Sequence, residues 1–175
     1  MQQAIAMGAV ESGREFAERL ERHRKIVFKV ANGYGRDAHE RADIAQEIAA
    51  QLWRAYPAYD GKRAFPTWMY RIALNVAISH LRATSLRERH SVPLDESLHD
   101  SAGAAGIEAE NDGRVRELRR CIERLDPLNR ALLLLYLDER SQAEIAEILG
   151  ITETNVATKI GRLKERLRKD LADAQ

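Results

Sequence analysis

The chain has 175 residues, of which 45% are hydrophobic and 31% charged, a mixture typical of soluble globular proteins rather than disordered ones. Its net charge is only +1, so the total charge indicates no particular partner. A single cysteine excludes an internal disulfide framework and suits a reducing cytosol. The longest apolar run, residues 131–137, is far shorter than the roughly 20 residues that a membrane helix needs. No charged-then-apolar leader opens the sequence, and we expect a cytoplasmic protein without membrane insertion.

Helical periodicity dominates the first half of the chain, where apolar residues recur at three- and four-residue steps. The sequence NGYGRD at 32–37 interrupts the first predicted helix, and a second helix over 42–56 carries Ile44, Ile48 and Leu52 on one stripe. Pro57 ends the second helix, because proline disfavours the helical conformation of the residue before it.

A third helix is predicted from Pro66 to residue 83, since proline fits the first helical turn, where its missing N–H is no loss. Trp68, Ile72 and Val76 are expected to form its buried stripe. The periodicity predicts one helical domain over residues 12–83, preceded by an N-terminal tail, residues 1–11.

The segment 84–113 is expected to be a flexible acidic linker. Its part 91–113 holds six acidic residues, no Lys or Arg, many Ser, Gly and Ala, and no apolar periodicity. We therefore expect two small helical domains, the second over residues 114–175, in an all-α fold without strands.

The second domain contains several helix start and stop signals. Asp126 and Pro127 are typical of an N-cap followed by the first helical residue, and Ser141 with Glu144 forms the S-x-x-E pattern of a capping box. Gly150 then suits a left-handed helix end. The resulting helix–turn–helix layout has a second helix from 153 to about 170.

The second helix of this pair has two chemically different faces. Its apolar stripe, formed by Val156, Ile160, Leu163 and Leu167, is expected to pack on Ile145, Ala146 and Leu149 of the first helix. The opposite face begins with short hydrogen-bonding side chains and continues with cations, the order that a recognition helix in the DNA major groove uses. The alternative is an ordinary helix pair with a solvated basic face. The candidate DNA-facing residues are Thr154, Asn155, Thr158, Lys159 and Arg162.

No catalytic or metal-binding pattern was found in the sequence. The stretch GYGRDA at 33–38 follows a predicted helix rather than a strand, which argues against a dinucleotide fingerprint. The five His residues and Cys121 show no zinc-ligand spacing. We expect no enzymatic activity, no metal and no cofactor.

Three segments in order, RADIAQEIAAQLWRA, FPTWMYRIALNVAISHLR and LDPLNRALLLLYLDERSQAEIAEILGITETNVATKIGRLKERLRK, resemble the sigma-70 family of bacterial RNA polymerase sigma factors. The likeness is greatest to the small two-domain extracytoplasmic-function (ECF) group. It implies a sigma2-like helical bundle and a sigma4-like helix–turn–helix domain. It also implies promoter-specific transcription initiation, through recognition of −35 and −10 elements and melting of the −10 region.

The resemblance also implies partners. Asp43, Gln46 and Glu47 correspond to a face that docks on the β′ clamp helices of core RNA polymerase, although a solvated helix face is the simpler alternative. The β flap, promoter DNA and an anti-sigma factor are further implied partners. The linker is implied to thread through the polymerase, or else it is a plain tether. The resemblance further implies that the candidate DNA-facing residues of the recognition helix contact the −35 element.

The implied −10 contacts lie in the loop before the third helix and along that helix. Ser79 stands where the family usually has Asp, so this helix departs from the family pattern at that position. The candidate −10 residues are Asp60, Gly61, Lys62, Arg63, Tyr70, Arg71, Asn75 and Arg82.

Two other functions remain open from the sequence. A stand-alone helix-turn-helix transcriptional regulator would bind duplex DNA alone, without the D-x-x-Q-E helix or the 59–82 segment. A sigma-like decoy would sequester an anti-sigma factor, and it would not need the basic DNA-facing residues that this chain has.

Overall fold

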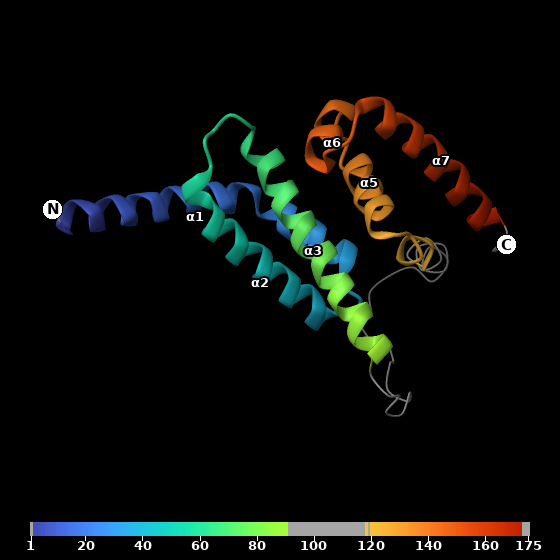
Figure 1. Ribbon diagram of the computed structural model, residues 1–175, viewed down its shortest axis with the longest axis horizontal. Coiled ribbons are helices and arrows are strands. Elements are labelled where there is room, and N and C mark those ends of the chain that lie inside the picture. Colours follow the sequence, from blue (N-terminus) through green and yellow to red (C-terminus); the bar gives the residue numbers. More distant parts are fainter. Residues whose placement is uncertain (1, 91–117, 119, 173–175) are drawn as a thin grey trace, which may run out of the picture.

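The computed structural model describes residues 2–90, 118 and 120–172. These residues form α-helices and one short 3₁₀ helix, with no strand among them, which confirms the all-α prediction. The predicted linker lies mostly outside the described residues, because only its part 84–90 is described, as the end of a helix. Figure 1 shows the elements, which are α1 (Gln2–Tyr34), α2 (Ala38–Ala55), η1 (Tyr56–Ala58), α3 (Phe65–His90), α5 (Pro127–Leu137), α6 (Gln142–Leu149) and α7 (Glu153–Ala172).

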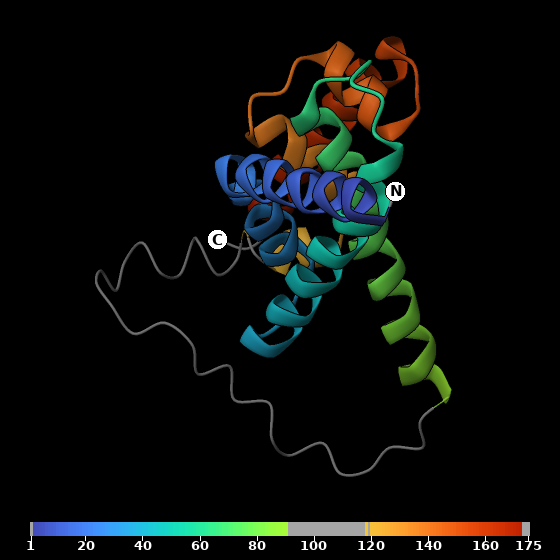
Figure 2. The same cartoon turned by 90° about the vertical axis from the view of Figure 1, so that its left-hand side faces the viewer.

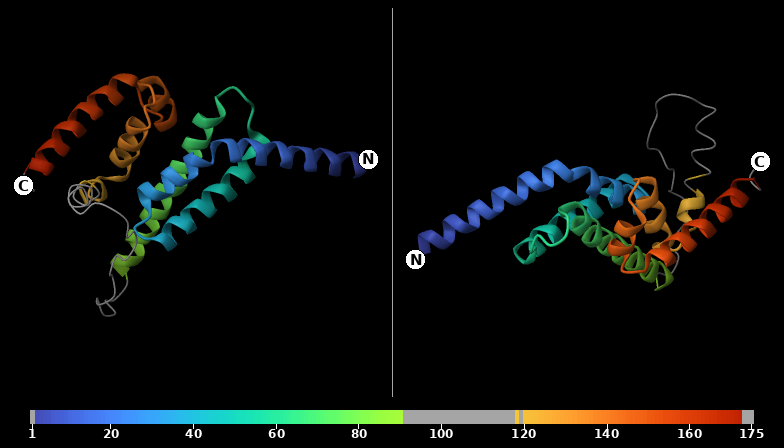
Figure 3. Two further views of the ribbon diagram at one scale, coloured as in Figure 1. Left: turned by 180° about the vertical axis from the view of Figure 1, so that it is seen from behind. Right: turned by 90° about the horizontal axis from the view of Figure 1, so that it is seen from above.

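The N-terminal domain consists of α1, α2 and α3, each packed on the other two. The predicted stripe on α2 is confirmed, since Ile44, Ile48 and Leu52 are fully buried. Helix α1 begins at Gln2, so most of the predicted N-terminal tail is helical, and its N-terminal part projects away from the body in Figure 3. The NGYGRD break is also confirmed, because α1 ends at Tyr34 and α2 begins at Ala38 with Asp37 as its N-cap.

The buried stripe of α3 differs from the predicted one. Met69, Ala73 and Ala77 are fully buried, whereas Trp68, Ile72 and Val76 are only partly buried. The reason is that α3 packs against α1, α2 and the C-terminal helices at once, so its most buried line lies one residue further along. Helix α3 also runs on to His90, beyond the predicted end at residue 83.

Aromatic rings support the loop between α2 and α3. Tyr59 packs on Trp68 and Phe65 at ring-centroid distances of 5.0 and 5.5 Å, and Tyr56 continues the cluster to Phe16 at 5.0 Å. The Tyr59 hydroxyl donates a hydrogen bond of 2.6 Å to the carbonyl of Arg63, which closes the loop on itself. The aromatic cluster therefore anchors the base of the loop, while its tip, residues 60–64, is exposed.

The C-terminal domain confirms the predicted caps. Asp126 accepts from the backbone N–H of Asn129, and Ser141 and Glu144 form the complete capping box. Gly150 ends α6 with φ 69° and ψ 35°, a left-handed conformation in which glycine carries no Cβ penalty. A tight turn follows, in which the Thr152 hydroxyl accepts from the N–H of Asn155, so α6 and α7 form the predicted helix–turn–helix.

The apolar stripe of α7 is largely as predicted, with Val156, Ile160 and Leu163 buried. Its partners on α6 differ in one position, because Ile148 is buried and Leu149 only partly so. Helix α5 lies beneath both helices and contributes Leu132 and Leu135, which are fully buried.

The two domains pack directly on each other. Figure 1 shows α3 between α2 on one side and the C-terminal helices on the other, and Figure 2 shows the α2–α3 loop on the same side of the molecule as α6. Helix α3 contacts α6 and α5, and α1 contacts α5. This arrangement decides which of the candidate functional residues are accessible.

Candidate polymerase and nucleic-acid interfaces

The polar face of α2 is exposed, as the sequence predicts. Asp43, Gln46 and Glu47 all point away from the buried stripe, because they lie one or two residues off Ile44 and Ile48 on the helix. Asp43 lies 3.6 Å from His39, and Glu47 accepts from Arg54 at 2.8 Å. These contacts lie at the solvent surface, where ion pairs contribute little stability and are readily exchanged for a partner.

A shallow groove of about 460 Å³ runs between α2 and α3. Its walls include Glu47 and Gln51 from α2, and Asn75 and Ser79 from α3. Its floor includes the partly buried side chains of Ile72 and Val76. A candidate polymerase contact and a candidate −10 contact therefore border one groove, which separate helical patterns in the sequence did not predict.

The loop from Tyr59 to Ala64 presents its polar tip to solvent. Asp60 accepts a hydrogen bond of 3.1 Å from the N–H of Lys62, and the Lys62 ammonium lies 3.3 Å from the same carboxylate. Gly61 has φ 73° with open space where a Cβ would stand, so the turn itself requires glycine. Arg63 leaves this loop toward the other domain, where its Nε donates to Glu147 of α6 at 2.8 Å.

The remaining candidate −10 residues on α3 divide into two sets. Arg71, Asn75 and Arg82 are exposed along one side of the helix. Tyr70 faces the C-terminal domain and is 0% exposed. Its hydroxyl donates to Asp138 at 2.6 Å, and the Arg140 guanidinium lies 5.2 Å from its ring centroid. Burial raises the pKa of the Tyr70 hydroxyl, so Tyr70 acts here as a neutral hydrogen-bond donor.

The candidate −35 residues lie together on the outer face of α7. Thr154, Asn155, Thr158 and Arg162 are exposed, and Lys159 is half-buried beside them. The Thr158 hydroxyl donates to the carbonyl of Thr154, while Asn155 in the first turn of α7 and Arg162 at its centre are exposed. The face that the sequence assigns to DNA is thus free of the N-terminal domain.

A polar cluster around Asp138 was not predicted from the sequence. Its side chain is only 9% exposed, and it accepts from Lys29 of α1, from Tyr70 of α3 and from Arg140 of its own turn. Arg140 binds the carboxylate through two nitrogens, both at 3.1 Å. Asp138 directly follows α5 in a turn of charged residues, and no helical pattern distinguishes it from its neighbours.

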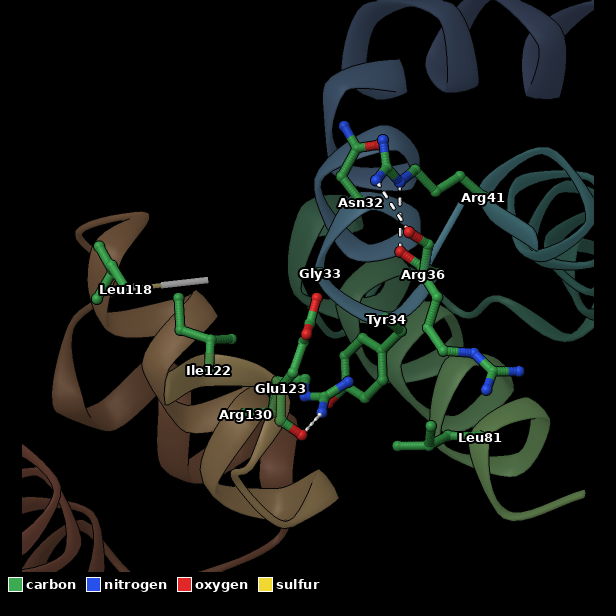
Figure 4. Close-up of a pocket in the computed structure, with 11 residues that line it drawn as sticks. Asn32, Gly33, Tyr34, Arg36, Arg41, Leu81, Leu118, Ile122, Glu123 and Arg130 are labelled. Atoms are coloured by element: carbon green, nitrogen blue, oxygen red, sulfur yellow. Dashed lines mark hydrogen bonds between the residues drawn. The ribbon is translucent and has the colours of Figure 1, made fainter. Parts of the chain in front are cut away.

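A second contact region between the domains is a cleft of about 340 Å³ at the end of α1, drawn in Figure 4. There the Tyr34 hydroxyl donates to the carbonyl of Pro127 at 2.8 Å, and Arg130 lies 5.4 Å from the Tyr34 ring centroid. Arg130 is 6% exposed and donates to the carbonyl of Glu123 at 2.6 Å. Its Nε is buried and has no acceptor among the described residues. Burial raises the pKa of the Tyr34 hydroxyl far above its usual range.

Family models and relatives identify this arrangement. The model for Sigma-70 region 2 matches residues 20–87, and the model for Sigma-70 region 4 matches residues 115–167. The chain is 30% identical over 171 residues to the ECF RNA polymerase sigma factor SigW of Bacillus subtilis, with 90% of this chain and 89% of SigW covered. The chain belongs to the ECF group of the sigma-70 family of RNA polymerase sigma factors.

A further relative agrees with this membership, and two solved structures share the fold. The chain is 35% identical to the ECF RNA polymerase sigma-E factor of Escherichia coli, over 71% of this chain and 70% of that protein. Its fold is similar to CnrH, solved in complex with the cytosolic domain of CnrY, with a TM-score of 0.66 and 24% identity over 97% of this chain and 95% of CnrH. It is also similar to the sigma factor RpoE of Bartonella quintana, solved with the anti-sigma factor NepR, with a TM-score of 0.69 and 15% identity over 91% and 98% of the two chains.

Membership in the ECF group gives the general function of the protein, which is a sigma factor for promoter-specific transcription initiation. The two functions that the sequence left open, a stand-alone regulator and a decoy, are not favoured, because the models for Sigma-70 region 2 and region 4 both match, in that order along the chain. Among the described residues, no helix is long and apolar enough to cross a membrane. No group of His, Cys, Asp and Glu in the same part of the chain is arranged to hold a metal ion.

Proposed function

We propose that the exposed face of α2 is the primary docking surface for core RNA polymerase. Asp43, Gln46 and Glu47 present two carboxylates and an amide at three- and four-residue spacing, and a basic partner surface complements such a face. The observation that supports this assignment most is their common exposure on a helix whose opposite side is fully buried. The partner element on the polymerase is the pair of β′ clamp helices, with the β flap contacting the C-terminal domain.

The −10 element is recognised in this proposal by the loop and by α3. Asp60, Gly61, Lys62 and Arg63 supply a glycine turn with flanking charges above a ring cluster, and this arrangement suits a base taken out of the DNA stack. Arg71, Asn75 and Arg82 lie along α3, where cations follow the backbone of a displaced single strand. Tyr70 joins this set only after the C-terminal domain has moved off it.

The −35 element is read by the outer face of α7. Thr154, Asn155 and Thr158 provide short hydrogen-bonding groups for base edges, while Lys159 and Arg162 contact phosphates. The acidic segment 91–113, which follows α3, connects the two DNA-binding domains and in this proposal threads through a basic polymerase channel. Catalysis belongs to the polymerase, the chain needs no cofactor of its own, and it works in the bacterial cytoplasm.

An anti-sigma factor is the proposed negative regulator. The support is that RpoE of Bartonella quintana, which shares the fold, was solved with the anti-sigma factor NepR. The chain's exposed apolar side chains, among them Phe28 and Leu137, offer contact area for such a partner.

In vitro transcription with purified core enzyme and genomic fragments tests the proposed function. We expect specific initiation on some fragments only when this protein is added. Core enzyme alone sets the background, and a chain that supports no initiation on any fragment would show the proposed function to be wrong.

The docking face is tested by replacing Asp43 and Glu47 with Arg together. The double reversal is expected to abolish binding to core polymerase in a pull-down, because two carboxylates become cations opposite a basic surface. A matched control reverses Glu18 and Glu21, which are exposed on α1. Circular dichroism checks that both variants remain helical. Unchanged binding by Asp43→Arg with Glu47→Arg would place the docking surface elsewhere.

A further inference from the structure

The loop between η1 and α3 is shaped by a side-chain hydrogen bond that joins its two limbs. The Tyr59 hydroxyl donates to the backbone carbonyl of Arg63 at 2.6 Å, near the short end of the range for O–H···O hydrogen bonds. Tyr59 lies on the limb that enters the turn at Gly61, and Arg63 lies on the limb that leaves it. The distance between the limbs therefore depends on this bond.

The Tyr59 ring is itself held in place by other rings. Its centroid lies 5.0 Å from that of Trp68 and 5.5 Å from that of Phe65, and both of these residues belong to the first turn of α3. The Tyr56 ring stacks on it at 6.3 Å, and Tyr56 is buried against Phe16 of α1. A ring that is fixed in this way loses little further side-chain freedom when its hydroxyl makes a hydrogen bond. The hydroxyl is therefore presented to the loop from a fixed position.

The turn at the tip of the loop has a separate, purely local support. Asp60 accepts from the backbone N–H of Lys62 at 3.1 Å, and Gly61 between them has φ 73°. A Cβ added to Gly61 would meet nothing within 4 Å, so this side of the turn faces open space. Of the hydrogen bonds that the described residues make within the loop, the one from Tyr59 ties the turn to the aromatic cluster.

We infer that Tyr59 is a positioning residue for −10 recognition, whose hydroxyl acts through the Arg63 carbonyl to hold the loop in the shape that receives an unstacked base. The inference rests on the −10 role proposed above for this loop. A site that already has its bound shape loses less free energy to ordering, and it rejects a base of the wrong shape because it does not adapt to it. Without the hydroxyl, the ring stays in its cluster but the limbs are free to separate, so the loop accepts more than one base.

Tyr59→Phe tests this role because it removes the hydroxyl and keeps the ring. The assay is in vitro transcription by core polymerase with the full chain, on a genomic fragment from which wild type initiates. Each base pair of the −10 region is changed in turn to the other three, and the ratio of transcript from the preferred base to that from the others gives the selectivity at each position. We expect Tyr59→Phe to lower this ratio about fivefold at one position, the scale of one hydrogen bond, and to leave the other positions unchanged.

Two further variants make the result specific to the loop. Gly61→Ala identifies the promoter position that the loop reads, because alanine is strained at φ 73°, and it is expected to lower selectivity at the same position as Tyr59→Phe. Tyr56→Phe is the matched control, since it makes the same change in the same ring cluster, and among the described residues the Tyr56 hydroxyl donates no hydrogen bond to the loop. It is expected to keep every ratio at the wild-type value. Circular dichroism checks that all three variants remain folded.

The outcomes separate this role from general stability and from the proposed function. Unchanged ratios for Tyr59→Phe, an equal fall at all positions, or a loss of initiation on every template overturns the inference, because the hydroxyl would then not govern the choice of one base. An equal effect of Tyr56→Phe, or an effect of Gly61→Ala at a different position, overturns it as well. In all these cases initiation by wild type leaves the proposed function intact. Wild type that initiates on no fragment shows the proposed function to be wrong, and the inference fails with it.

Discussion

The two proposed promoter-reading surfaces of this sigma factor differ in accessibility. On α7, Thr154, Asn155, Thr158 and Arg162 are exposed and lie away from the N-terminal domain. On the N-terminal domain, Arg63 is paired across the interface and Tyr70 is fully buried. The same C-terminal domain thus presents one DNA surface and covers part of the other.

This difference shows that the chemistry of a side chain and its accessibility are separate properties, although a sequence motif suggests both at once. The chemistry of a side chain decides what it can bind, whereas its neighbours in the fold decide when it can bind. Duplex contacts through α7 need no movement of the domains, whereas contact with Tyr70 of α3 requires that the C-terminal domain move off it. Polymerase docking on α2 does not depend on such a movement, because Asp43, Gln46 and Glu47 are exposed while the C-terminal helices pack mainly on α3 and α1.

Changes on the exposed face of α7 are expected to give the largest effect, a loss of duplex DNA binding. Lys159→Ala and Arg162→Ala should each weaken duplex binding by roughly tenfold at moderate salt, because each cation neutralises a phosphate and releases its counterion. Each change should also reduce the slope of log affinity against log salt by about one. Fluorescence anisotropy with a short duplex over a salt series measures both quantities.

Lys164→Ala is the control for this prediction. Lys164 is a cation on the same helix, but its ammonium lies 4.5 Å from the ring centroid of Tyr136, on the flank that faces α5. Its loss is expected to leave the salt slope nearly unchanged. An equal decrease for all three variants would mean that α7 attracts DNA by general charge, and the assigned face would lose its support.

The covered surface should be released by a change that involves no charge. Gly33→Leu places a branched side chain where even a Cβ would stand 2.9 Å from the Leu134 Cδ1, so Leu134 or the domain that carries it must shift, and the added bulk favours separation of the domains. We expect a larger radius of gyration and at least about fivefold tighter single-strand binding, the equivalent of about 1 kcal/mol of overpacking. Scattering and anisotropy on the full chain measure these values.

Gly161→Leu is the size-matched control, because Gly161 lies on α7 with nothing within 4 Å of an added Cβ. It is expected to leave the radius of gyration unchanged. If Gly33→Leu opens the chain without raising single-strand affinity, the difference between the two surfaces is one of packing only, and covering the −10 residues has no consequence for binding.

Much of the fold could be predicted because its signals are local. The Ser141–Glu144 capping box and the Gly150 turn each involve a few neighbouring residues, and the stripe of Ile44, Ile48 and Leu52 needs only the helical repeat. The α3 stripe was predicted one residue early, because α3 packs on several sides and carries apolar residues on more than one face. A single repeat does not choose between such faces.

The site was predictable where exposure follows from the helical repeat, as it does for the outer faces of α2 and α7. It was not predictable where contact with the other domain determines whether a residue is exposed. Tyr70 is 68 residues from Asp138 in the sequence, and Lys29 is 109 residues from it. No local pattern links residues that lie so far apart in the sequence.

The smallest expected effect is on folding stability and concerns α6. This helix packs against α7, and its Glu147 pairs with Arg63 of the N-terminal domain. Hydrogen bonds from the backbone and side chain of Ser141, with the nearby Arg140 guanidinium, lower the pKa of Glu144. Its contribution to folding is therefore full above the ordinary carboxyl range and is lost as the pH falls through the lowered pKa. Glu144→Gln should be less stable than wild type at neutral pH, and this difference should vanish in acid. Because Glu144 is 40% exposed, we expect less than about 1 kcal/mol, measured by urea unfolding across a pH series. A difference that persists at low pH would assign the effect to side-chain packing instead of to the charge at the α6 cap.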